Sequence, residues 1–136
     1  MLDPIKILLA RKWGKGRYAL ISTAGETIPE ILAKFGLKPF EEGLRDVTAA
    51  QASEILKQLL WKDAAYNAEC MSETEAAQLT AQIMTVHGGE SCKYLSNADP
   101  QHPGSFYPMT EATLDSGIII IRPDNIHICI WFEDED

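Results

Sequence analysis

Residues 117–132, GIIIIRPDNIHICIWF, decide the fold of this chain. The runs 117–122 and 126–132 are rich in β-branched and aromatic residues, which are typical of strands. Pro123-Asp124-Asn125 separates them with a turn composition in which proline suits the first corner. The stretch therefore predicts a C-terminal β-hairpin.

Four segments upstream of the hairpin carry the signals of helix N-termini. Asp3 before Pro4 is an N-cap followed by a first-turn proline. Three capping boxes, in which a Ser or Thr stands three residues before a Glu or Gln, begin at Thr27, Thr48 and Ser72. Apolar residues recur at helical spacing after each signal. We therefore expect four helices, over residues 3–14, 27–36, 48–62 and 72–88.

Early helices and late strands predict an α+β protein. Residues 17–22 resemble a further strand, and weaker strand candidates are 65–71, 92–95 and 105–109. The chain has 136 residues, enough for one ordinary domain and too few for two. We expect a single domain over residues 1–136, with a mixed or antiparallel sheet, about four helices packed on one face of it, and the C-terminal hairpin.

The charge of the chain is unevenly distributed. The formal net charge is −8, from twelve basic and twenty acidic side chains. Residues 1–63 hold ten bases and eight acids, a net of +2, whereas residues 64–136 hold two bases and twelve acids, a net of −10. An acidic half repels nucleic acid and attracts a basic protein. The alternative is that the acidity only keeps the protein soluble.

Cysteines and hydropathy give an expectation for the compartment. Cys70, Cys92 and Cys129 cannot all pair within one chain, which favours a reducing compartment. The run of isoleucines at 118–121 is far shorter than the roughly 18 apolar residues of a membrane helix. We expect a cytoplasmic protein that binds neither membranes nor nucleic acid.

The last predicted strand is apolar on both faces. One interpretation is a central strand that is covered on both sides. The other is a partner-binding surface, because interfaces use aromatic anchors surrounded by polar residues. The candidate partner-binding residues are His127, Cys129 and Trp131 on one strand face, with Arg122, Glu133, Asp134, Glu135 and Asp136 flanking them.

Residues for catalysis or metal binding are few. A zinc site needs more ligands than the two that His127 and Cys129 could supply. The sequence contains no CxxC or HxxxH spacing that would supply the others. His87 and Cys92 would have to approach this pair in space to form a metal or Cys-His site. We expect no catalytic residues, no metal and no cofactor.

Three functional hypotheses follow. The first is a small acidic protein-binding module, an inhibitor or immunity-type protein that neutralises a basic partner protein. The second is a structural subunit or homo-oligomer that uses the terminal strand as its interface. The third is a small enzyme with an unrecognised Cys/His site.

Overall fold

The computed structural model describes residues 15–22, 26–63, 66–102 and 104–134. In these ranges the chain forms five strands, three α-helices and one short 3₁₀-helix. The elements are β1 (Lys15–Ser22), α2 (Ile28–Phe35), η1 (Glu41–Gly43), β2 (Arg45–Val47), α3 (Ala49–Trp61), α4 (Glu73–His87), β3 (Lys93–Ser96), β4 (Leu114–Ile121) and β5 (Ile126–Asp134). The predicted α+β class is confirmed.

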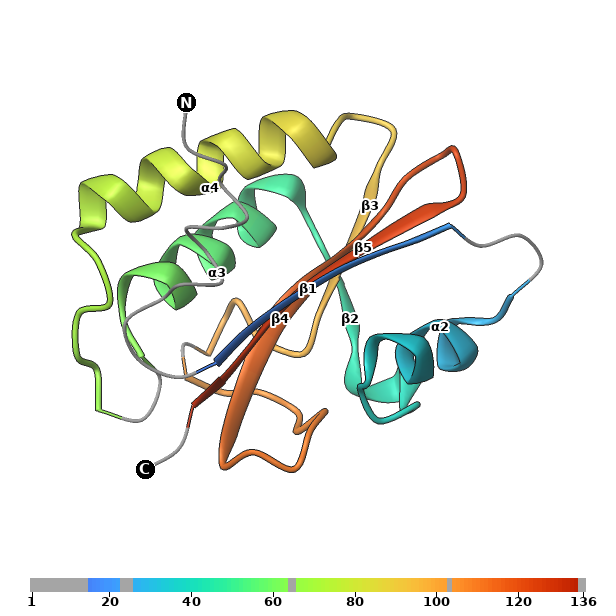
Figure 1. Ribbon diagram of the computed structural model, residues 1–136, viewed down its shortest axis with the longest axis horizontal. Coiled ribbons are helices and arrows are strands. Elements are labelled where there is room, and N and C mark those ends of the chain that lie inside the picture. The colour runs from blue at the N-terminus through green and yellow to red at the C-terminus, as the bar shows by residue number, and fades with distance from the viewer. Residues whose placement is uncertain (1–14, 23–25, 64–65, 103, 135–136) are drawn as a thin grey trace.

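All five strands belong to one antiparallel sheet with the order β1-β5-β4-β3-β2 (Figure 1). The predicted C-terminal hairpin is confirmed, since β4 and β5 pair in a register that places Ile118 opposite Ile130. Both strands extend beyond their predicted limits. Strand β5 is hydrogen-bonded to β4 on one side and to β1 on the other, so it is an interior strand of the sheet.

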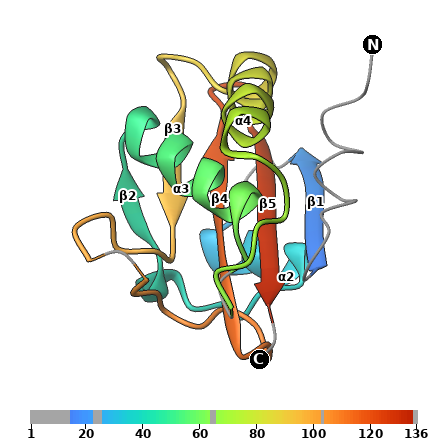
Figure 2. The same ribbon diagram turned by 90° about the vertical axis from the view of Figure 1, so that its left-hand side faces the viewer.

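Helices cover both faces of the sheet, whereas we had expected them on one face. Figure 2 shows α3 and α4 in front of the sheet and α2 behind it. Leu56 of α3 and Ile83 of α4 pack with Ile118 and Ile130 in one core cluster. Leu32 of α2 belongs to a second cluster on the opposite face. The reason is that β4 and β5 are apolar at consecutive positions, so each face of the sheet needs its own cover.

The helix N-termini lie where the capping boxes predict them. Thr27 and Thr48 form both arms of a capping box with Glu30 and Gln51. At Ser72 the hydroxyl accepts a hydrogen bond from the N3 amide, the first arm of the predicted box. The fourth predicted helix, over residues 3–14, lies outside the described residues. The number of described α-helices is therefore three, where about four were expected for the whole chain.

Two weak strand predictions are wrong, and one strand was missed. Residues 66–71 contribute only an isolated bridge to Lys62, and residues 105–109 only an isolated bridge between Phe106 and Ala98. The missed strand is β2, whose three residues carry no alternating pattern. It forms because β3 offers a free edge and the chain passes beside it on the way to α3.

Candidate functional site

The structure buries the three residues that we proposed as the face of a partner-binding surface. Trp131 is fully buried, and Cys129 and His127 retain 2% and 8% of their exposure. Cys129 and Trp131 pack in the core cluster on the α2 side of the sheet. Of the two interpretations of this strand, the covered central strand describes its structure, because α2 and the segment before β4 cover the face of Cys129 and Trp131.

A glycine makes room for the indole of Trp131. Gly117 lies directly opposite Trp131 in the register of β4 and β5. A Cβ atom added at Gly117 would collide with the indole ring and with the carbonyl oxygen of Ile130. The largest side chain of the sheet is therefore accommodated by the absence of a side chain on the neighbouring strand.

The flanking polar residues do not gather around one surface. Glu133 and Asp134 are residues of β5 itself, and Asp134 is buried. Arg122 lies at the other end of the strand, where its guanidinium binds both carboxylate oxygens of Asp124. Eight residue steps separate the two ends of β5, which is about 27 Å. Glu135 and Asp136 lie outside the described residues.

The residues considered for a Cys/His site form two pairs on opposite faces of the sheet. The thiol of Cys92 lies 4.0 Å from the carbonyl oxygen of His87, which ends α4, whereas His127 and Cys129 lie on the other face, that of α2. Burial lowers the pKa of His87, and the positive charge of Arg122 lowers that pKa further. Burial also lowers the pKa of His127, against weaker raising effects of the Asn125 backbone and of Glu26. Within the described residues no three His, Cys, Asp or Glu side chains group as metal ligands, and no cysteine forms a disulfide.

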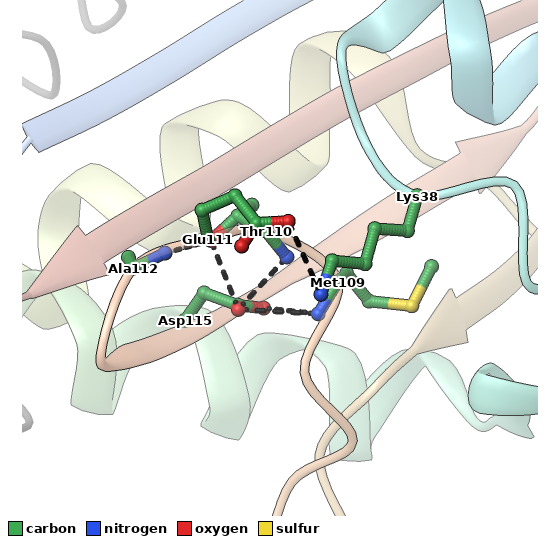
Figure 3. A network of polar contacts seen from close by, with 6 residues as sticks. All are labelled: Lys38, Met109, Thr110, Glu111, Ala112 and Asp115. Atoms are coloured by element: carbon green, nitrogen blue, oxygen red, sulfur yellow. Dashed lines mark hydrogen bonds and ion pairs between the residues drawn. The ribbon is translucent and has the colours of Figure 1, made fainter.

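A buried carboxylate organises the segment that leads into β4. Asp115 is 2% exposed and faces the α2 side of the sheet. Its oxygens accept hydrogen bonds at 3.0–3.1 Å from the backbone amides of Met109 and Thr110 and from the Thr110 hydroxyl (Figure 3). The indole nitrogen of Trp131 donates to the same carboxylate at 3.1 Å. One side chain thus fixes the segment and the central strand together.

The same network fixes the backbone of Tyr107. The side-chain amide of buried Asn97 donates to a carboxylate oxygen of Asp115 and to the carbonyl oxygen of Tyr107, at 3.0 and 2.8 Å. The amide of Tyr107 donates back to the carbonyl oxygen of Asn97 at 2.9 Å. Tyr107 therefore lies in an irregular segment whose backbone is held at several points.

The ring of Tyr107 lies against the turn that follows α2. A Cβ atom added at Gly43 of η1 would collide with this ring. Nearby, the amide of Lys38 donates to the carbonyl oxygen of Met109 at 2.8 Å, and the Lys38 ammonium lies 3.5 Å from the Glu111 carboxylate (Figure 3). Two segments that are distant in the sequence, 37–43 and 104–113, are thus joined by backbone and side-chain contacts.

Two aromatic side chains are exposed where these segments meet. Phe40 and Tyr107 each keep 42% of their exposed area. The amide of Gly43 donates to the carbonyl oxygen of Phe40 at 2.9 Å, which places Phe40 in the turn that touches Tyr107. The acidic residues of these segments are Glu41, Glu42 and Glu111. We call the five residues Phe40, Glu41, Glu42, Tyr107 and Glu111 the aromatic–acidic patch.

Sequence patterns did not single out this patch. Both aromatic residues lie in irregular segments, next to Pro39 and Pro108. Phe40 belongs to no predicted element, and Tyr107 lies in residues 105–109, which we had expected to form a strand. A local signal existed only for Phe40, which stands between Pro39 and Glu41, outside any amphipathic pattern. Its exposure could not be deduced, since it depends on contacts between segments more than 60 residues apart.

A groove lies on the other face of the sheet, between α3 and the loop that contains Asp99 and Phe106. Its cavity volume is about 880 Å³. Ile55, Leu59 and Phe106 contribute apolar side chains to its lining. The lining includes four acids, Glu54, Asp63, Asp99 and Asp115, and one base, Lys62. We call this cavity the α3 groove.

The ionisation of Asp99 is fixed by its neighbours. A ring nitrogen of His102 lies 2.8 Å from one carboxylate oxygen, and the amide of Gln101 donates to the other at 3.0 Å. These hydrogen bonds, that to His102 first, lower the pKa of Asp99 below its usual value, and the charge of Arg45 lowers it further. Asp99 therefore carries a negative charge at neutral pH.

Comparison of the chain with models of protein families, with curated proteins and with solved structures gives no match. Among the described helices, none combines the length and the apolar composition that crossing a membrane requires.

Proposed function

We propose that this protein is a small acidic protein-binding module, of the inhibitor or immunity type, that neutralises a basic partner protein. The observation that supports this proposal is the aromatic–acidic patch, in which two exposed aromatic side chains stand among acids on a fixed backbone. Tyr and other aromatic residues are the common anchors of protein interfaces, because they bury a large area at a small cost in side-chain entropy.

The charge of the patch indicates the kind of partner. Its three glutamates and the adjacent Lys38 sum to −2, and the whole chain carries −8. Complementary charge speeds the encounter of two proteins and disfavours partners of the same sign. A partner with a basic surface fits both the local and the total charge.

The rigidity of the patch also favours binding. The hydrogen bonds of Asn97 hold the backbone of Tyr107, and the contact with Gly43 positions its ring. A surface that is ordered before binding loses less conformational entropy in the complex. Tyr66, a further exposed aromatic residue, is 70% exposed and lies in the connection between α3 and α4, so it provides a control outside the patch.

The experiment compares capture of partners from a lysate of the cells that make the protein. Immobilised wild type, the double variant Phe40→Ala/Tyr107→Ala and the control variant Tyr66→Ala are used in parallel. We expect a basic protein, identified by mass spectrometry, to be retained by the wild type and the control. The affinity of the purified pair should fall about thirtyfold in the double variant, since aromatic hot spots contribute about 2 kcal/mol.

Salt dependence and folding provide the controls. Raising the salt concentration should slow association of the pair, because screening weakens electrostatic steering. The unfolding midpoints of all three proteins are measured too. The midpoint of the double variant should fall slightly, because the Tyr107 ring packs against Gly43, and affinities are compared under conditions in which every variant is folded. A partner that binds the double variant as tightly as the wild type would refute the role of the patch, and an acidic partner would refute the proposed function.

A further inference from the structure

The ring of Tyr107 is covered on one side only. A Cβ atom placed at buried Gly43 would lie 2.4 Å from the Cδ1 atom of this ring and within 3.0 Å of Cγ and Cε1. The turn of η1 therefore covers the side of the ring that faces Gly43. Tyr107 nevertheless keeps a large exposed area, which lies on the parts of the ring that face away from this turn.

Two acids of the aromatic–acidic patch carry charges that no neighbouring base compensates. Glu41 and Glu42 are exposed, and neither carboxylate forms an ion pair or a hydrogen bond with another described residue. Asp99 of the α3 groove differs, because its carboxylate lies 3.4 Å from Arg45. Glu111, the third acid of the patch, already has a lysine at 3.5 Å. Two negative charges of the patch are therefore available to a partner.

These two carboxylates lie close to the ring along the chain. Glu42 directly precedes Gly43, which contacts the ring of Tyr107, and Glu41 precedes Glu42. Consecutive Cα atoms are about 3.8 Å apart, so the two glutamate Cα atoms lie within about 4 and 8 Å of that of Gly43. Phe40 belongs to the same turn, since its carbonyl oxygen accepts a hydrogen bond from the Gly43 amide. One turn thus presents an apolar ring and two carboxylates beside the open side of Tyr107.

This combination of groups fits the side chain of arginine. A cation over the face of a tyrosine ring is attracted by the ring electrons. The guanidinium group is planar, so it stacks on an aromatic ring and donates two parallel hydrogen bonds to one carboxylate. Its methylene stem packs on apolar surface while the charged head stays at the surface. Lysine offers a compact and strongly hydrated charge, which uses the ring and the carboxylate less well.

We propose that the aromatic–acidic patch binds an arginine side chain of the partner protein. The guanidinium group stacks on the open side of the Tyr107 ring and donates hydrogen bonds to Glu41 or Glu42, and the methylene stem packs on Phe40. This inference rests on the proposed function, because it names the residue of a basic partner that the patch holds.

The test selects random dodecapeptides displayed on phage against the immobilised full-length protein. Peptides that also bind Phe40→Ala/Tyr107→Ala are discarded, so that the remaining peptides bind the patch. These peptides are synthesised with arginine, lysine or citrulline at each arginine position, because citrulline keeps the shape of arginine without its charge. Their affinities for the wild type are measured by fluorescence anisotropy.

We expect every patch-binding peptide to contain arginine. Citrulline at the position that binds the patch should weaken binding about tenfold or more, because the attraction to the ring and the ion pair are both lost. Lysine at this position should weaken binding about threefold or more. Patch-binding peptides without arginine, equal binding of the citrulline peptides, or failure to select any patch-binding peptide would overturn the inference.

The two carboxylates are tested by Glu41→Gln/Glu42→Gln. This variant should weaken binding of the arginine peptides about fivefold or more, because it removes the charges that pair with the guanidinium group. The matched control Glu69→Gln/Glu90→Gln makes the same charge change at exposed glutamates outside the patch and should leave the affinity within about twofold. Equal losses in the two variants would contradict a local ion pair.

The ring is tested by two substitutions at Tyr107. Tyr107→Phe keeps the aromatic ring and should bind the peptides within about threefold of the wild type, whereas Tyr107→Leu keeps only an apolar side chain and should lose about tenfold. Unfolding midpoints are measured alongside, and affinities are compared where all variants are folded. Equal affinities of the Phe and Leu variants would contradict stacking on the ring.

The failure of this inference can be distinguished from the failure of the proposed function. A basic partner that needs the patch, together with patch-binding peptides that lack arginine, would overturn the inference and leave the proposed function standing. Arginine peptides that bind the patch, together with an acidic partner in the lysate, would support the arginine site and refute the proposed function.

Discussion

Replacing Asp115 with Ala should strongly destabilise the protein. The carboxylate accepts hydrogen bonds from five donor groups, and the residue is 2% exposed. In the variant the side-chain amide of Asn97 retains its hydrogen bonds to the carbonyl oxygens of Tyr107 and of residue 115. The hydroxyl of Thr110 can rotate towards another acceptor. The loss therefore falls on three donors that cannot move away.

These three donors are the amides of Met109 and Thr110 and the indole nitrogen of Trp131. A buried donor that loses its acceptor costs about 1–3 kcal/mol. Three such donors cost about 3 kcal/mol at the lower limit of this range. The value should lie near the lower limit, because water can enter the site once the carboxylate is gone. We expect a loss of about 3–5 kcal/mol, a large part of the 5–15 kcal/mol that stabilises a typical domain.

Asp115→Asn separates the acceptor role from side-chain volume. One carboxylate oxygen accepts from Asn97, Met109 and Trp131, and the other accepts from Met109 and Thr110. In the Asn variant, the side-chain NH2 group replaces one of these oxygens. In either position this donor therefore faces other hydrogen-bond donors. The Asn variant should lose about 2–3 kcal/mol although its shape is almost unchanged.

The assay is guanidinium denaturation followed by far-ultraviolet circular dichroism and by tryptophan fluorescence. Asp124→Asn is the control, since this carboxylate binds Arg122 at the surface and its loss should cost less than about 1 kcal/mol. The two probes should give the same midpoint if unfolding is two-state. A loss below about 1 kcal/mol in both Asp115 variants would refute the network as the anchor of residues 104–113.

Two further predictions concern the core and the histidines. Leu56→Ala should cost about 2–5 kcal/mol in urea denaturation, because this fully buried side chain packs between α3 and the sheet; a loss below about 0.5 kcal/mol would contradict the packing. Lowering the pH from about 7.5 to about 5.5 should reduce the free energy of unfolding, since burial lowers the pKa of His127 and of His87 in the folded protein and the unfolded chain takes up protons first. This stabilisation is complete above the unfolded pKa of about 6.5 and is lost as the pH falls towards the folded values. The double variant His87→Gln/His127→Gln should show a flatter pH dependence, and an unchanged slope would contradict this origin.

The sequence predicted the hairpin because its signals are local. The β-branched and aromatic composition and the turn at Pro123 all lie within sixteen residues. The helix N-termini are local in the same way, since a capping box connects residues three positions apart. The predicted helix N-termini and hairpin strands therefore form in the structure, with small shifts of their limits.

The cover of β5 could not be predicted because it depends on distant segments. A strand that is apolar on both faces is consistent with a central strand and with an interface. Leu32 and Met109, which cover the face of Cys129 and Trp131, come from elements about 20 to 100 residues away in the sequence. The choice of Asp115 as the acceptor for Trp131 is equally non-local, and no sequence pattern distinguishes this aspartate from the exposed ones.

The structure also changes how the charge of the chain should be interpreted. Because residues 64–136 carry a net charge of −10, we had expected this half of the chain to attract a basic partner. However, Asp115 and Asp134 of that half are buried in or beside the sheet, where they serve its structure. The aromatic–acidic patch draws Glu41 and Glu42 from the half whose net charge is positive. The field that a partner meets depends on which acids the fold brings to one surface, so charge reversal at Glu41 and Glu42 is a more direct probe of steering than removal of the acidic C-terminus.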